Sequence, residues 1–286
     1  YATLLQQHGQ TDLLLQRMLL YFIRTDNLEE VLRLRNYFQG RPRADINPYI
    51  YAEMGGYLVT KDRLNGVLDI LQRSLEIDEA VPDTHYHLAR YYARTEDPLN
   101  QRRGLSNAIS YFRAREPLEA RRAGRLVDSY TRLGEYYYER EEFLTARENL
   151  ESAVQRYEQY ESRGLLEPQP RYGRAYASLG DIAYYVSREY GQAFELYAQA
   201  EQNAYGSPEL DYKQGYIHYA REEHQAALNE FYNAEPEFRR NRNLLYAIAN
   251  ALYQRGAYSS AQGIYAELLS MLQQQRDRIT NLLVDQ

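Results

Sequence analysis

The side chains that most often carry out chemistry are sparse in this sequence and poorly placed for it. The chain has no Cys, so it offers neither a thiol nucleophile nor a Cys-ligated metal site. Its His residues are scattered, and the closest pair, His85 and His87, is two positions apart and cannot share one face of a helix. No Gly-rich phosphate loop, paired-His zinc motif or calcium loop occurs. We therefore expect no enzymatic activity, no metal and no cofactor.

The residues that stand out are instead suited to binding. The sequence contains 31 Tyr and no Trp, and its basic residues are almost all Arg, with Lys only at Lys61 and Lys213. Tyr and Arg offer broad, stiff, amphipathic contact surfaces and are enriched in interfaces, although genome base composition would explain the Arg bias equally well. The net charge of -6 argues against nucleic acid as a partner, because nucleic-acid-binding domains are usually strongly basic.

Helices must position these residues. Only nine Pro and 16 Gly interrupt the 286 residues, and between them apolar side chains recur at spacings of three and four, the period of an α-helix. No apolar run approaches the roughly 20 residues that a transmembrane helix needs. We expect an all-α protein without a transmembrane segment in these residues.

The helical pattern itself repeats. Each second helix carries a small residue, a large one four positions later and a small one three positions after that, so that all three share a face on which another helix can approach closely. The matching residues are Ala193, Tyr197 and Ala200, then Ala227, Phe231 and Ala234, then Ala261 and Tyr265. The helix before each has its own pattern, as in Tyr130, Leu133, Gly134 and Tyr137, which precede Phe143, Ala146, Leu150 and Ala153.

This chain is similar to the tetratricopeptide repeat (TPR) family, whose repeat has the same length of 34 residues. The similarity is clearest over residues 126–269, although Tyr130 stands where the family usually has Trp, and residues upstream match as degenerate repeats. Residues 13–23 and 28–38 would form a further helix pair at the N-terminal end. The resemblance implies an all-α, right-handed superhelical solenoid of antiparallel helix pairs, with about six to seven repeats.

We expect one solenoid over residues 1–286, with a possible division into degenerate repeats in 1–160 and regular repeats in 172–286. Surplus residues predict insertions around Thr95–Gly104 and in 160–172, where Gly164 and the Pro168-Gln169-Pro170 run must end a helix. Residues 259–286 predict one long terminal helix. Its apolar residues have the rhythm of a coiled-coil seam, so it could join two copies or cap the solenoid: Leu268, Leu272, Ile279 and Leu282.

In this family the first helices of successive repeats line a concave surface, and partners bind there as extended peptides or helices. The resemblance nominates residues by their distance from the small residue at which the two helices of a repeat cross. The predicted site is Tyr86, Arg90, Arg94, Glu135, Tyr138, Asp181, Tyr184, Tyr212, Tyr216, Tyr219, Tyr246, Asn250 and Tyr253. Its tyrosines could instead brace neighbouring helices. Family members that capture chaperone tails clamp a carboxylate, but the corresponding places here are mostly changed: Thr131, Glu135, Ser178, Glu209 and Lys213.

One segment is rich in positive charge. Between Arg90 and Arg125 there are nine Arg and only four carboxylates. This surplus predicts a surface for an acidic partner or an anionic lipid, unless these Arg residues pair with carboxylates of the chain itself or simply lie in solvent.

Together these features predict a scaffold or adaptor that binds another protein or peptide along a Tyr-rich groove. Two alternatives stay open: a structural part of a bacterial cell-envelope assembly, since the chain is faintly similar to periplasmic repeat proteins of spirochaetes including their flagellar collar, and a glycan-binding envelope protein. The chain begins at Tyr1 rather than Met, which suggests a processed form or a fragment from which a signal peptide or anchor has been removed. The lack of Cys favours the envelope slightly over the cytoplasm.

Overall fold

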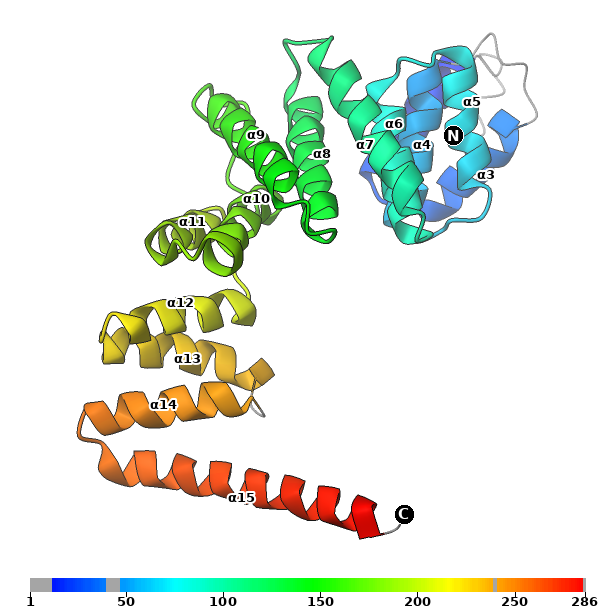
Figure 1. Cartoon of the computed structure of the whole chain (residues 1–286). Helices are drawn as coiled ribbons and strands as arrows, with labels where there is room; N and C mark the ends of the chain where they lie inside the picture. Colours follow the sequence, from blue (N-terminus) through cyan, green and yellow to red (C-terminus); the bar gives the residue numbers. More distant parts are fainter. Residues whose placement is uncertain (1–11, 40–46, 239–240, 285–286) are drawn as a thin grey trace. The chain divides into compact units, whose positions relative to one another are not determined.

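The chain folds into α-helices that follow one another as antiparallel pairs (Figure 1). The computed structural model describes residues 12–39, 47–238 and 241–284, except for the side chains of residues 12, 13, 39 and 277–284. Within those residues there is no β-strand. The chain divides into two compact units, unit 1 (Tyr1–Glu167) and unit 2 (Pro168–Gln286), each considered by itself below.

Unit 1 contains four helix pairs within its described residues. They are α2 (Asp12–Arg24) with α3 (Leu28–Gln39), α4 (Pro48–Thr60) with α5 (Val67–Ile77), α6 (Pro82–Arg94) with α7 (Pro98–Arg113), and α8 (Ala120–Tyr138) with α9 (Phe143–Glu161). The first helix of each pair also contacts the first helix of the next, because α4 touches both α2 and α6, and α6 touches α8.

Unit 2 contains three pairs. They are α10 (Pro170–Asp181), continued by the π-helical turn η2 (Ile182–Ser187), with α11 (Tyr190–Gln202), then α12 (Pro208–Ala220) with α13 (His224–Phe238), and α14 (Arg242–Gln254) with α15 (Tyr258–Val284). Figure 1 shows α12 to α15 stacked in chain order, with α15 reaching beyond the end of α14. The expected long terminal helix is present, but Ile279 and Leu282 of its predicted seam lie outside the described side chains.

Local sequence explains where these helices begin and how the pairs turn. Five helices start with Pro, whose missing N–H is not needed there: Pro48, Pro82, Pro98, Pro170 and Pro208. Each pair has a residue with positive φ soon after its first helix: Asp26, Asp62, Glu96, Glu141, Arg188, Glu222 and Gly256. This left-handed residue ends the first helix and reverses the chain. It recurs in all seven described pairs, although the connection between α4 and α5 is longer and has a second such residue, Gly66, and α10 ends in the π-helical turn η2.

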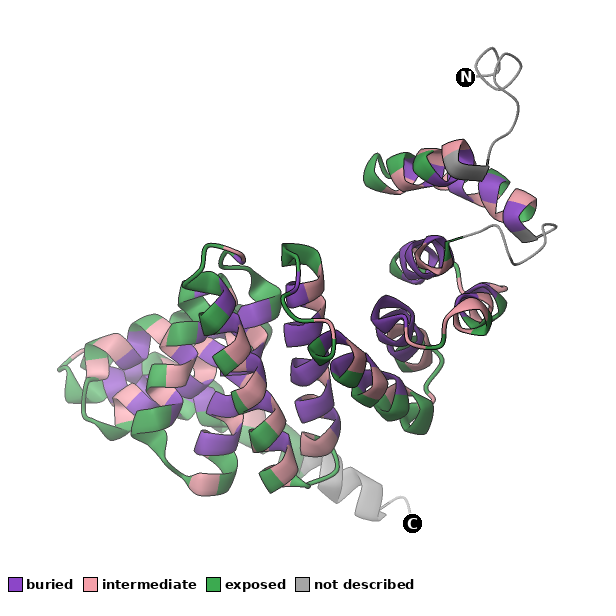
Figure 2. Ribbon diagram, turned by 90° about the horizontal axis from the view of Figure 1, so that it is seen from above, coloured by how far each residue is buried: buried purple, intermediate pink, exposed green. Residues whose placement is uncertain are grey.

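The two helices of a pair cross at a small residue, as the sequence predicts. A Cβ atom on Gly134, Gly180 or Gly215 would lie within 3.0 Å of a buried side chain of the second helix, respectively Leu150, Tyr197 and Phe231. Only Gly allows this approach. Figure 2 shows the result as stripes of buried residues along the helices, with exposed residues on the other faces.

The insertion expected around Thr95–Gly104 is wrong. Residues 95–97 alone join α6 to α7. Gly104 lies against α6, since a Cβ there would be 3.1 Å from that of Ala89. Counted from the start of α7, Ala108 takes the last place of the small–large–small pattern, as Ala153 does in α9. The surplus residues lie after α7, in the connection 114–119 and in the early turns of α8, which begins at Ala120, well before its crossing residue Gly134.

Candidate functional site

The residues of unit 2 surround a hollow of about 560 Å³. It is lined by Tyr184 and Tyr185 of η2, by Tyr212, Tyr216 and Tyr219 of α12, and by Asn243, Tyr246, Ala247 and Asn250 of α14. The first helices of three successive pairs thus contribute to it. Six residues of the predicted site meet here: Tyr184, Tyr212, Tyr216, Tyr219, Tyr246 and Asn250. We call this feature the tyrosine hollow.

The rings around the tyrosine hollow hold one another in place. Tyr212 lies edge-on to Tyr216, with ring centroids 4.8 Å apart, and stacks on Phe238 at 5.0 Å. Tyr184 lies edge-on to Tyr185 at 4.9 Å. Burial raises the pKa of Tyr184 to about 12 and also raises the pKa of Tyr216. These phenols therefore stay neutral near pH 7, and because no lining residue is charged, the hollow offers aromatic rings, hydroxyls and amides.

Tyr185 lines the tyrosine hollow but is missing from the sequence prediction. The π-helical turn inserts one residue at the end of α10, so that two consecutive tyrosines reach the hollow instead of one. The sequence contains a signal for this insertion. In the α14 and α15 pair the end tyrosine packs on a ring five positions later, Tyr253 on Tyr258, whereas Tyr184 packs on Tyr190, six positions later.

Some tyrosines brace the helix pairs. Near the turn of a pair, the last tyrosine of the first helix packs edge-on to an aromatic ring at the start of the second, as in Tyr138 with Phe143 at 5.6 Å and Tyr253 with Tyr258 at 5.2 Å. Tyr253 does not line the tyrosine hollow. Tyr184 does both, since it lines the hollow and packs on Tyr190 at 5.3 Å. Bracing and lining are therefore compatible roles at this repeat position.

Asp181 belongs to an ion-pair cluster around the buried Lys213, beside the tyrosine hollow. Its carboxylate accepts a hydrogen bond from Tyr197 Oη at 2.8 Å and pairs with Lys213 Nζ at 2.7 Å. Lys213 is only 3% exposed and also pairs with Glu209 at 2.8 Å. Burial opposes the charge on Lys213, but these two carboxylates prevail and raise its pKa. Lys213 is thus occupied and cannot clamp the terminal carboxylate of a partner.

The predicted site residues of unit 1 are engaged within the unit or partly exposed. Tyr86 is buried, and its hydroxyl donates to Asp128 Oδ2 at 2.8 Å. Arg90 donates to Thr60 Oγ1 at 2.9 Å and lies over the Tyr86 ring. The others are at least partly exposed: Arg94, Glu135 and Tyr138. Tyr86 therefore acts as a brace and offers no ring to a partner.

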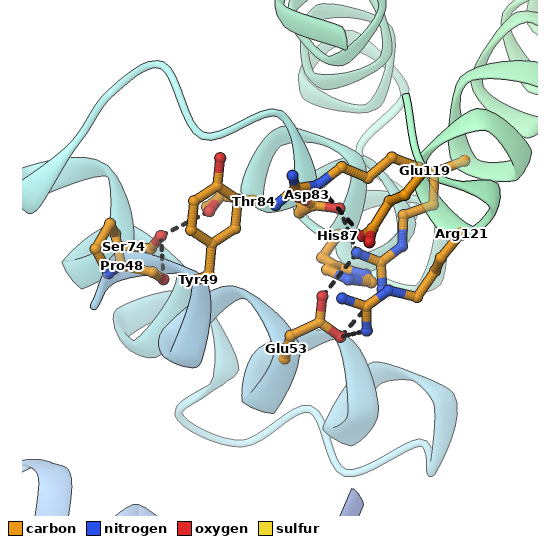
Figure 3. A network of polar contacts seen from close by, with 12 residues as sticks. Pro48, Tyr49, Glu53, Ser74, Asp83, Thr84, His87, Glu119 and Arg121 are labelled. Carbon is orange, nitrogen blue, oxygen red and sulfur yellow. Dashed lines mark hydrogen bonds and ion pairs between the residues drawn. The ribbon is translucent and has the colours of Figure 1, made fainter. Parts of the chain in front are cut away.

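The Arg-rich segment forms an internal ion-pair network in unit 1 (Figure 3). Arg125 of α8 pairs with Glu53 of α4 at 2.7 Å and, over a short distance, with Asp83 of α6. Arg121 pairs with Glu53 at 2.9 Å, and Arg122 pairs with Asp83 at 3.0 Å. The side chains of Glu53 and Asp83 are buried. These three Arg residues thus join α4, α6 and α8, as the pairing alternative predicts, and are not a free basic surface.

His87 is buried beside this network. Its Nδ1 atom lies 3.4 Å from Arg90 Nη1, and its Nε2 atom is buried without a hydrogen-bond partner in the described structure. A Cβ on Gly56 of α4 would collide with its ring. Burial, together with the positive charges of Arg125, Arg90 and Arg121, holds the pKa of His87 well below its ordinary value. The imidazole is therefore neutral in the folded protein.

The described residues contain no group of three or more His, Asp or Glu side chains placed to hold a metal ion. In the same part of the chain, no helix combines the length and the apolar character needed to cross a bilayer.

Comparison of the sequence finds no match among protein-family models and none among curated proteins. The structure is similar to that of PilF from Pseudomonas aeruginosa, with a TM-score of 0.57 and 17% identity over 79% of this chain and 91% of that one. It is also similar to the apo form of RapI, with a TM-score of 0.56 and 11% identity over 88% and 74% of the two chains.

A third similar structure is the C-terminal part of a TPR repeat-containing protein from Cytophaga hutchinsonii, with a TM-score of 0.51 and 13% identity over 77% of this chain and 78% of that one. Identities this low establish the fold alone. They agree with the repeat read from the sequence and with the seven described helix pairs. The chain is thus an all-α repeat protein with the fold of the tetratricopeptide repeat family.

Proposed function

We propose that this protein is a non-enzymatic scaffold that binds a segment of a partner protein in the tyrosine hollow of unit 2. The observation that supports this role is the convergence of six tyrosines from η2, α12 and α14 around one opening. A volume of about 560 Å³ falls within the range of ligand pockets in proteins. Tyr is also enriched among the residues that dominate binding energy in interfaces.

The lining indicates the chemistry of the segment. Because no lining side chain is charged, affinity would come from apolar contact with the rings and from hydrogen bonds to hydroxyls and amides. Asn243 and Asn250 lie two turns apart on α14, where their amides can bond to separate polar groups of an extended backbone. The proposed ligand is therefore an extended segment with apolar or proline side chains.

The proposal places the site in unit 2. In unit 1, Tyr86 and Arg90 are tied into internal contacts, and three Arg residues are held by Glu53 and Asp83. Breaking such contacts would cost free energy before a partner gained any. The tyrosine hollow is open already, and its rings are held in place by one another, so binding there needs little reorganisation.

The test is capture of partners from the native organism with the wild-type chain and with Tyr185→Ser and Tyr246→Ser variants, read by mass spectrometry. Tyr185 and Tyr246 are 52% and 56% exposed, so these changes should leave the fold intact. The matched control removes two equally exposed rings outside the hollow, Tyr21 and Tyr232. A protein retained by the wild type and the control but lost by both hollow variants supports the proposal; partners indifferent to these changes contradict it.

A glycan is the second candidate ligand. Sugar rings can stack on tyrosine while their hydroxyls bond to amides, and the hollow combines both groups. Direct titration with oligosaccharides, followed by the tyrosine fluorescence of the wild type and of Tyr246→Ser, separates this candidate from the first. The role in a bacterial cell-envelope assembly, for example a spirochaete flagellar collar, also stays a prediction. Fractionation of the native cells would test it.

A further inference from the structure

The last helix pair of unit 2 carries large apolar side chains on its surface. Tyr246 of α14 is 56% exposed, and Leu269 and Leu272 of α15 are 57% and 49% exposed. All three line a groove of about 430 Å³ between α14 and α15, together with Arg242, Asn243, Tyr265 and Leu268. Single exposed apolar residues are common, but several in one groove mark an interaction surface. We call this the terminal groove.

The preceding pair shows how the same repeat positions are covered. Tyr212 stands one repeat before Tyr246 and is half-buried. The groove of its own pair, α12 and α13, is occupied by a helix, because α14 contacts both of them. Leu244 and Ile248 of α14 share one core with Phe231 of α13. In this fold, a third helix therefore packs into the groove between two paired helices.

No described residue packs against α14 and α15 in this way, and at two positions the terminal groove has a larger or more apolar side chain than its counterpart. Leu268 and Leu269 stand where α13 has Ala234 and Glu235, one repeat earlier. An exposed Leu in place of Glu leaves apolar area in water, and covering it is favourable by about 25 cal/mol per Å². Figure 1 shows that α15 also continues beyond α14, which lengthens the surface available to a covering helix.

We infer that the terminal groove is a docking surface for an amphipathic α-helix of a partner protein. The helix lies against α14 and α15 as α14 lies against α12 and α13, with apolar side chains three and four residues apart over Leu269 and Leu272. The charge of Arg242 predicts a further property of the partner helix. Arg242 is the single charged residue of the lining, and its guanidinium donates to Gln275 at 2.6 Å without an ion pair in the described structure. A carboxylate on the partner helix would complement it.

The chain provides its own probe, because α14 is a helix that already packs into the equivalent groove between α12 and α13. A fluorescent peptide with the sequence of residues 241–256 is titrated into the full chain and followed by anisotropy. We expect saturable binding that Leu269→Asp and Leu272→Asp each weaken at least tenfold. The matched control is Leu144→Asp, at a residue of α9 that is 74% exposed, which should leave binding unchanged. Thermal melts of the variants show that they remain folded.

Two peptide versions test the charge. With Glu at the positions of Asn243 and Asn250, the peptide should bind severalfold more tightly than with Lys there, and Arg242→Gln should remove the difference. This inference does not rest on the tyrosine hollow, since Tyr185→Ser should not affect the titration. Absence of binding, or binding indifferent to Leu269→Asp and Leu272→Asp, overturns it. A wild-type dimer in sedimentation that Leu272→Asp converts to monomer also overturns it, because the occupant would then be a second copy.

Discussion

Equivalent tyrosines of this repeat have different surroundings because their neighbours differ. Tyr212 and Tyr246 occupy the same repeat position, but α14 covers the first and no described helix covers the second. Tyr86 also holds this position, and its hydroxyl is bonded to Asp128 of α8, the first helix of the next pair. Repeat position therefore fixes where a ring lies on its helix, while the next helix along the chain decides whether that ring braces the fold or meets solvent.

A methyl group at the crossing of a helix pair should be costly. Gly215→Ala places Cβ within 3.0 Å of the fully buried ring of Phe231, so α12 and α13 must move apart. We expect a loss of about 2 kcal/mol in the free energy of unfolding, within the range found for overpacked cores. Denaturant titration measures it.

Gly263→Ala is the matched control for this change. Gly263 is exposed within α15, and a Cβ there meets nothing within 4 Å. Because Ala favours helix over Gly by about 0.5–1 kcal/mol, this variant should be slightly more stable than the wild type. Equal effects of the two variants would contradict close packing at Gly215.

His87 should make unit 1 sensitive to mild acid. Its pKa is lowered by burial and by Arg125, Arg90 and Arg121, with Tyr86 edge-on at 5.1 Å and the carboxylates of Glu53 and Asp83 already paired in the neighbouring network. Below pH 6.5 the unfolded chain takes up a proton at this imidazole and the folded chain does not, so stability is lost as pH falls from there toward the lowered pKa. The expected loss between pH 7 and pH 5 is up to about 2 kcal/mol.

Denaturant titration of the wild type and of His87→Gln over this pH range measures the loss. The variant should show a smaller slope of stability against pH, whatever its stability at pH 7, because it lacks the titrating group. Parallel curves for the two proteins would mean that His87 does not carry the effect.

Among the elements, the early part of α8 is the distinctive one. It lies before the crossing residue Gly134 and carries Arg121, Arg122 and Arg125, which reach carboxylates on both α4 and α6. These guanidinium groups therefore hold three successive first helices together. An extension that looks like a surplus in the sequence acts as a clamp in the structure.

Removing one buried carboxylate should release this clamp. Asp83→Asn leaves Arg122 and Arg125 without the charge they share, and breaking a buried pair typically costs 3–5 kcal/mol. The comparison is Asp62→Asn, whose carboxylate is exposed and 4.0 Å from Arg94; it should change stability little. Thermal unfolding of the two variants checks this, and a small effect of Asp83→Asn would show that the network does not stabilise the unit.

The sequence predicts those features of the elements that repeat. The crossing residues Gly134, Gly180 and Gly215 follow from spacing alone, because close helix approach requires a small residue at that point in every pair. The ion-pair network does not, since Glu53 and Arg125 are far apart in the chain and only tertiary packing brings them together. Tyr185 reaches the tyrosine hollow through a single inserted residue, and the position of Gly104 against Ala89 depends on the length of one turn. The 34-residue period alone does not predict such departures, and the insertion at Tyr185 is marked only by the six-residue spacing of Tyr184 and Tyr190.

On the scale of the whole molecule, the main contacts join helices that are close neighbours in chain order. Each pair packs within itself, and α4, α6 and α12 reach the first helices of adjacent pairs. Proteins built in this way behave as a series of coupled repeats, whose stability is a sum of local terms. A substitution should therefore act mainly on its own pair and the adjacent ones, and unfolding of the full chain should not be a single two-state transition.

Hydrogen exchange of the full chain, resolved by peptide, tests this locality. Asp83→Asn should speed exchange at least 100-fold in α4 to α9 while leaving α12 to α15 nearly unchanged, because its expected cost of about 3–5 kcal/mol is two or more factors of ten in the opening equilibrium, at about 1.4 kcal/mol each. Gly215→Ala should have the opposite pattern, with faster exchange in α12 to α15 and little change in α4 to α7. The two variants serve as controls for each other, since both lower stability but in different units. Faster exchange over the entire chain in either variant would show that the repeats open as one cooperative body. The stability of this protein could then not be described as a sum of contributions from separate repeats.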